Sequence, residues 1–91
     1  MTRHDKTIDR IVCGNADAGI RFQDLVAVLS KLGFDMRVRG DHHIFSRTGI
    51  VEILNLQPHG GKAKPYQVKQ VRAILTTYGL VRSVNDQEEE Q

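Results

Sequence analysis

The stretch "LGFDMRVRGDHHIFSRTG", residues 32–49, decides the fold, because the spacing of its apolar residues changes there from helical to extended. Up to the first residue of this stretch, the apolar residues recur at helical intervals: Phe22, Leu25, Val26, Leu29 and Leu32. Gly33 supplies the left-handed conformation that ends such a helix. After Gly33, Phe34, Met36 and Val38 alternate with Asp35, Arg37 and Arg39. The pattern predicts a helix from about Arg21, followed by a strand with one face in the core and two arginines facing solvent.

Two turn signals within and after this stretch predict two further strands. Gly40 and Asp41 can reverse the chain into a strand from His42 to Arg47. Thr48 and Gly49 precede "IVEILNL", residues 50–56, which predicts a third strand in an antiparallel meander. Ile44 and Phe45 are both apolar, so the alternation leaves open whether His42 or His43 faces the core.

Helical patterns flank this predicted sheet on both sides. Pro65 suits the first turn of a final helix whose buried stripe ends before Gly79: Val68, Val71, Ile74, Leu75 and Tyr78. Near the start of the chain, Ile8, Ile11 and Val12 predict a short amphipathic helix that ends near Gly14. We expect an α+β fold of α-β-β-β-α order, with both helices on one face of the sheet and an extra N-terminal helix. This is the arrangement of double-stranded-RNA-binding domains. Between the third strand and the final helix, "HGGKAK", residues 59–64, is expected to be an exposed, mobile loop.

The composition predicts one domain without a membrane span. The chain has 91 residues, of which 40% are hydrophobic, enough for one core but not for two. It contains no long apolar run and no apolar segment typical of a secretory signal, so we expect a soluble, cytoplasmic protein. Cys13 is the single cysteine, so it has no disulfide partner within the chain, and we expect it to be buried or half-buried.

The charge is unevenly distributed along the chain. Four of the eleven acidic residues lie in "DQEEEQ", residues 86–91, so the rest has 13 basic residues against seven acidic ones, a formal charge of +6. This division predicts a disordered acidic tail on a basic body. The basic residues of the predicted sheet and loop suit a phosphate-binding surface and an ordinary solvated surface about equally: Arg37, Arg39, Arg47, Lys62 and Lys64.

The adjacent histidines favour acid–base chemistry over the alternatives. His42 and His43 should point to opposite faces of a strand, and no further Cys/His set is present, so we predict no metal site and no cofactor. No serine or cysteine lies near them in a recognisable nucleophile setting. An imidazole beside bound RNA can take the proton of a ribose 2′-hydroxyl. From the residue types alone, a structural pair with one packed and one exposed histidine is the more common arrangement.

Two runs of the sequence resemble the HicA toxin family, the small RNases of HicA–HicB toxin–antitoxin pairs. They are "FQDLVAVLSKLGFDMRVRGDHHIF" and "LQPHGGKAKPYQVKQVRAIL", within about Ile20 to Leu80. The resemblance implies a double-stranded-RNA-binding-like fold, metal-independent cleavage of mRNA and neutralisation by a HicB-like antitoxin. It also implies that His42 is the catalytic histidine and that His43 has a supporting or packed role. Substrate-binding residues are then expected around it: Arg37, Arg39, Gly40, Asp41, His59, Lys62 and Lys64.

One residue departs from the family pattern. Asp41 occupies the position where the family usually has serine. A carboxylate there would favour a protonated imidazole and repel a phosphate, so it can tune the base, orient the ring or weaken turnover. A related RNA-binding module that no longer cleaves RNA is therefore the alternative function. The predicted organisation is an N-terminal helix and loop at 1–19, a HicA-like domain at 20–81 and the acidic tail at 82–91.

Overall fold

The computed structural model describes residues 3–14 and 16–81 of the chain, with side chains from Lys6 onward. The acidic tail predicted at 82–91 lies outside the described residues. Three α-helices, one 3-10 turn and three strands follow in the order α1 (Arg3–Cys13), η1 (Asp17–Gly19), α2 (Phe22–Lys31), β1 (Asp35–Arg39), β2 (His42–Ser46), β3 (Leu54–Leu56) and α3 (Pro65–Thr77). Within this part of the chain, no helix is both long enough and apolar enough to cross a membrane.

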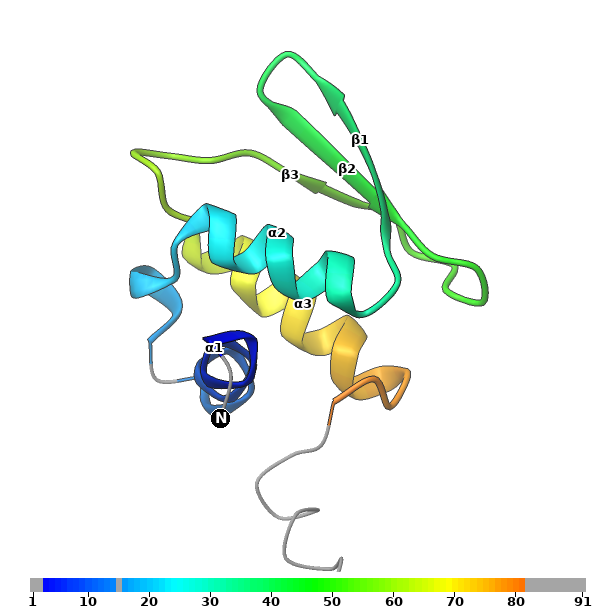
Figure 1. Cartoon of the computed structure of the whole chain (residues 1–91), viewed down its shortest axis with the longest axis horizontal. Coiled ribbons are helices and arrows are strands. Elements are labelled where there is room, and N and C mark those ends of the chain that lie inside the picture. Colours follow the sequence, from blue (N-terminus) through cyan, green and yellow to red (C-terminus); the bar gives the residue numbers. More distant parts are fainter. Residues whose placement is uncertain (1–2, 15, 82–91) are drawn as a thin grey trace, which may run out of the picture.

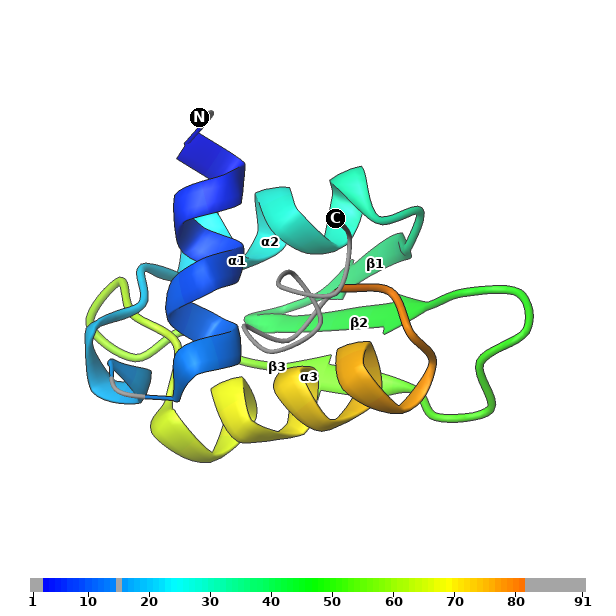
Figure 2. The ribbon, with the colours of Figure 1, turned by 90° about the horizontal axis from the view of Figure 1, so that it is seen from below.

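The strands form one antiparallel meander of order β1-β2-β3. Figures 1 and 2 show all three helices on the same side of this sheet, with α2 and α3 nearest to it and α1 against the two helices. The predicted α+β fold, with an extra N-terminal helix, is therefore confirmed. The helices also end where the sequence predicts, since Gly33 follows α2 with a φ of +91° and the Phe34 N–H donates to the Leu29 carbonyl.

The strand register resolves the ambiguity between the two histidines. Phe45 lies opposite Met36 on one side and Leu54 on the other, and His43 lies opposite Val38 and Leu56. Phe45, Leu54 and Leu56 are buried against the helices, so this parity marks the inner face of the sheet. His43 therefore shares the inner face, and His42 belongs to the outer face.

The core lies between the inner face of β2 and β3 and the helices. The fully buried residues include Ile11 of α1, so the N-terminal helix contributes to the same core as the rest of the chain. The predicted stripes of α2 and α3 supply most of the other core residues: Phe22, Leu25, Leu29, Val68, Val71, Ile74 and Leu75. Val28 of α2 is also buried, although the predicted stripe did not include it. Burial of this apolar surface is the main stabilising contribution to the fold.

Two expectations about the strands are wrong. Met36 and Val38 have the inner-face parity but are 42% and 54% exposed, and every residue of β1 is exposed. Figure 1 shows the reason, because β1 is an edge strand and the β1–β2 hairpin rises away from the helices toward its turn. The third strand is also shorter than residues 50–56, since it begins only at Leu54 and leaves Val51 and Ile53 exposed in the preceding loop.

The prediction of a buried or half-buried Cys13 is also wrong, because this last residue of α1 is exposed.

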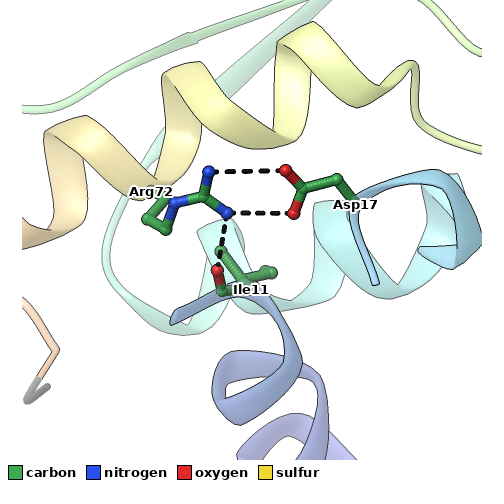
Figure 3. Close-up of polar contacts among 3 residues, drawn as sticks. All are labelled: Ile11, Asp17 and Arg72. Carbon is green, nitrogen blue, oxygen red and sulfur yellow. Dashed lines mark hydrogen bonds and ion pairs between the residues drawn. The ribbon is translucent and has the colours of Figure 1, made fainter. Parts of the chain in front are cut away.

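A contact of Arg72 explains how the end of α1 is held. The Arg72 guanidinium of α3 makes two hydrogen bonds with the Asp17 carboxylate, at 2.9 and 3.3 Å, and a third with the Ile11 carbonyl at 3.1 Å (Figure 3). This bidentate ion pair is partly buried. Arg72 thereby fixes the end of α1 and the following turn to α3.

Candidate functional site

His42 and two arginines share the outer face of the β1–β2 hairpin. Arg39 is directly opposite His42, and Arg37 is opposite Ile44. Alternate residues of a strand point to the same face, so Arg37 and Arg39 lie on the face of His42. All three side chains are exposed. The face opposite to the helices therefore carries an accessible imidazole beside two cationic groups of the neighbouring strand.

The ring of His42 is oriented by Asn55 of β3. Its Nδ1 lies 3.0 Å from the Asn55 side-chain oxygen. Asn55 is the β3 partner of Ile44, so it reaches His42 diagonally across the outer face. An amide oxygen only accepts hydrogen bonds, so Nδ1 carries the hydrogen. In the neutral ring, Nε2 is then the nitrogen that can accept a proton.

The turn between β1 and β2 is tied to the end of β3. Gly40 has a φ of +61°, a backbone conformation that suits glycine at a tight turn. The Asp41 carboxylate accepts a hydrogen bond of 3.0 Å from the Gln57 side-chain amide. The Asp41 carboxylate thus fixes the turn beside His42, while Asn55 contacts the His42 ring.

His43 lies on the other face and contacts the helical layer. Its ring meets Phe22 of α2 edge to face, with centroids 4.8 Å apart and an interplanar angle of 71°. Its Nδ1 donates to the Asp41 carbonyl at 3.1 Å, and the side chain is half-buried. His43 therefore joins the hairpin to the start of α2.

The predicted loop residues follow β3 at the same end of the sheet as the hairpin turn (Figures 1 and 2). His59 and Lys62 exchange two backbone hydrogen bonds across Gly60 and Gly61, of 2.9 and 3.1 Å. Both side chains are exposed, as expected for this loop, but its backbone forms a closed turn. Lys64 is half-buried at the start of α3, where its N–H donates to the Gln67 side-chain oxygen at 3.2 Å.

The predicted site residues thus form two groups. One comprises the outer face and turn of the hairpin: Arg37, Arg39, Gly40, Asp41 and His42. The other comprises the loop residues His59, Lys62 and Lys64, on a separate segment at the same end of the sheet. The sequence prediction missed Asn55 and Gln57, which hold His42 and Asp41. A signal was present, because Asn55 is polar between Leu54 and Leu56 and so belongs to the outer face of a strand.

A scan against protein families matches residues 22–80 to the HicA toxin of bacterial toxin-antitoxin systems. The matched region is more than half of the chain and contains α2, the whole sheet and α3. The chain belongs to the HicA toxin family. Searches of curated proteins and of solved structures found no match. Membership of the HicA family implies a toxin role and an antitoxin partner, while α1 and η1 precede the region that the family match covers.

Proposed function

We propose that this HicA-family chain is the toxin of a type II toxin–antitoxin pair and acts as an mRNA endoribonuclease, with His42 as the general base. The observation that carries the proposal is the exposed His42 imidazole, whose Nδ1 is held by Asn55 and which lies directly opposite Arg39. Such a ring is oriented before substrate arrives and keeps Nε2 for the substrate.

The chemistry follows from this orientation. Nε2 of His42 takes the proton of a ribose 2′-hydroxyl, and the 2′-oxygen attacks the adjacent phosphorus. The bond from phosphorus to the 5′-oxygen of the next nucleotide breaks, and that oxygen leaves as a hydroxyl after taking a proton from solvent. The products are a 2′,3′-cyclic phosphate and a 5′-hydroxyl end. This route uses no metal ion and no cofactor.

The neighbouring cations support the same reaction. Arg39 and Arg37 lie on the face of His42, where guanidinium groups can offset the charge that develops on the attacked phosphate. His59, Lys62 and Lys64 belong to the loop at the same end of the sheet and are proposed to bind flanking phosphates. Gly40 and Asp41 shape the turn that presents His42.

We further propose that the antitoxin is HicB-like and covers the outer face that carries His42. An RNase that cleaves mRNA without restraint would arrest its own host, so its active face has to be blocked. A partner on this face would compete with RNA for Arg37 and Arg39. Because both residues are cationic, we propose that the contact surface of the partner is acidic.

The test is single-turnover cleavage of a defined single-stranded RNA. His42→Ala should lose about 10²–10⁴-fold in rate, the usual contribution of a positioned acid or base. Ser46→Ala is the matched control, because Ser46 is an exposed residue of the same strand and the same face. Activity of the parent chain should persist in EDTA.

The alternative function is RNA binding without cleavage. The Asp41 carboxylate favours it, because a negative charge next to His42 would repel the phosphate that has to be attacked. Full activity in folded His42→Ala, or a strict requirement for an added divalent metal, would contradict His42 as the base. RNA binding without cleavage by the parent chain would favour the non-catalytic module.

A further inference from the structure

A row of three basic residues crosses the loop that follows β3. Lys62 is the antiparallel backbone partner of His59 on one side and of Arg21 on the other. Hydrogen bonds from His59 N to Lys62 O and from Ala63 N to Ile20 O, both of 2.9 Å, hold the three segments side by side. Directly opposed residues of antiparallel segments point to the same face, with Cβ atoms about 4.5–5.5 Å apart. All three side chains are exposed.

This row places like charges opposite one another. Arg21 and Lys62 are both cationic at neutral pH, and like charges at directly opposed positions destabilise a pair of strands. Among the described residues 6–14 and 16–81, the structure shows no ion pair that involves Arg21 or Lys62. A bound phosphate would offset this repulsion, and the exposed row is open to one.

A pocket of about 390 Å³ adjoins the row, because Arg21 belongs to both. It lies between the start of α2, the inner face of β2 and the loop, and is lined by Arg21, Phe22, Gln23, His43, Pro58 and Gly61. The volume is in the range of small-ligand sites. His43 and Phe22 supply aromatic surface. Gln23 supplies an amide that can both donate and accept, as the edge of a nucleobase requires.

We propose that the row and the pocket form a second RNA subsite, which binds one nucleotide that flanks the cleaved bond. Its phosphate lies on Arg21, Lys62 and His59, and its base enters the pocket, where His43 and Gln23 make binding selective for the base. The inference rests on the proposed ribonuclease function. The RNA is single-stranded at this point, because the bases of an A-form duplex are not accessible to such a pocket.

The position of the two histidines supports this path for the RNA. His42 and His43 are consecutive residues at the start of β2 and point to opposite faces of the sheet. An RNA strand that passes around the end of the hairpin can meet His42 on the outer face and the His43 pocket on the inner face. The subsite then selects the sequence next to the bond that His42 cleaves.

Binding is measured in the His42→Ala chain, so that the RNA stays intact. The probes are four fluorescent single-stranded homopolymers of A, C, G and U, titrated at several salt concentrations. Arg21→Ala should weaken binding of every homopolymer about tenfold and reduce the salt slope by about one. Gln23→Ala should reduce the difference between the homopolymers and leave the salt slope unchanged. Lys31→Ala, at the other end of α2, and Gln70→Ala, on α3, are the matched controls and should match the parent.

A competition experiment separates a nucleotide from phosphate alone. The nucleoside monophosphate of the preferred base should displace the RNA at lower concentration than inorganic phosphate, and Gln23→Ala should remove that advantage. Equal competition by inorganic phosphate and all four monophosphates would overturn the base pocket. Unchanged RNA affinity and salt slope in Arg21→Ala would overturn the phosphate row. Because these measurements read binding alone, their failure is distinct from failure of the proposed cleavage, which is judged by the activity of His42→Ala.

Discussion

His42 and Asn55 meet across the outer face of the sheet, with the histidine Nδ1 3.0 Å from the asparagine side-chain oxygen. The two residues are 13 positions apart in the chain, and the β2–β3 register brings them together. Since the amide oxygen accepts the Nδ1 hydrogen, this contact selects the tautomer in which Nε2 is free of hydrogen and can accept a proton. Asn55 is therefore a positioning residue for the proposed reaction.

We predict that Asn55→Ala slows single-turnover cleavage about 10- to 100-fold, less than the loss of His42 itself, because the base remains but is no longer oriented. Asn55→Asp should recover part of the rate, since a carboxylate also accepts from Nδ1. It should also move the acid limb of the pH–rate profile to higher pH, because the carboxylate stabilises the imidazolium. An unchanged pH profile in Asn55→Asp would indicate that Asn55 has a merely structural role.

Binding and cleavage should depend on different residues. His42→Ala should leave RNA affinity nearly unchanged, because most of the affinity comes from arginine and lysine contacts that release counterions from the RNA. Charge reversal in Lys62→Glu and Lys64→Glu should weaken binding far more and flatten its salt dependence. Gel-shift titrations at several salt concentrations measure both effects. Equal losses from His42→Ala and from the lysine changes would contradict this division.

The sequence predicted the elements well where the evidence was local. The helix α2, its end at Gly33 and the entry of Pro65 into α3 all depend on neighbours within a few residues, and each is confirmed, although the predicted stripe of α2 left out the buried Val28. The exposure of Met36 and Val38 was missed, because alternation shows which residues share a face but not how close the helices lie to that face. The distance between the helices and the sheet is set by tertiary packing, which a local pattern does not show.

The site shows the same division between local and non-local information. The turn at Gly40 and the candidate base His42 are visible in the sequence and in its resemblance to the HicA family. Which histidine faces outward is not, since Ile44 and Phe45 are both apolar and the burial of Phe45 decides it. The pairing of Lys62 with Arg21 also depends on segments about 40 residues apart, which no local pattern reveals.

The Arg72 contact should govern how firmly α1 is held. Arg72→Ala removes three hydrogen bonds and leaves the Asp17 carboxylate partly buried without its partner, so we expect a loss of about 2–3 kcal/mol in unfolding free energy. Arg72→Lys should lose less, because the charge remains but the bidentate geometry does not. Urea denaturation followed by circular dichroism measures both, with Lys69→Ala, an exposed residue of the same helix, as the control. Equal stability of Arg72→Ala and Lys69→Ala would contradict the assigned role.

A pH-dependent contact joins the β2–β3 loop to the end of α3, where the Tyr78 hydroxyl donates to the Glu52 carboxylate at 2.5 Å. This hydrogen bond lowers the pKa of Glu52 and raises the pKa of Tyr78 above their ordinary values. The Glu52 contribution to stability is therefore present above the ordinary glutamate pKa and is lost as the pH falls through the lowered value. The Tyr78 contribution is present below the ordinary tyrosine pKa and is lost as the pH rises through the raised value.

The tyrosine side of this contact can be followed directly. Tyr66→Phe leaves Tyr78 as the single tyrosine, so the ultraviolet absorbance of tyrosinate reports its titration alone. We expect the midpoint to lie above the ordinary tyrosine value and to fall when Glu52→Gln is added, because the amide removes the negative charge that favours the protonated phenol. Both groups are at the surface, so the accompanying change in stability should be small and should shrink further in high salt. Glu52→Gln should also abolish the difference in stability between neutral and acidic pH that this contact contributes. A midpoint that does not move on Glu52→Gln would show that the Tyr78 hydroxyl does not donate to Glu52 in solution.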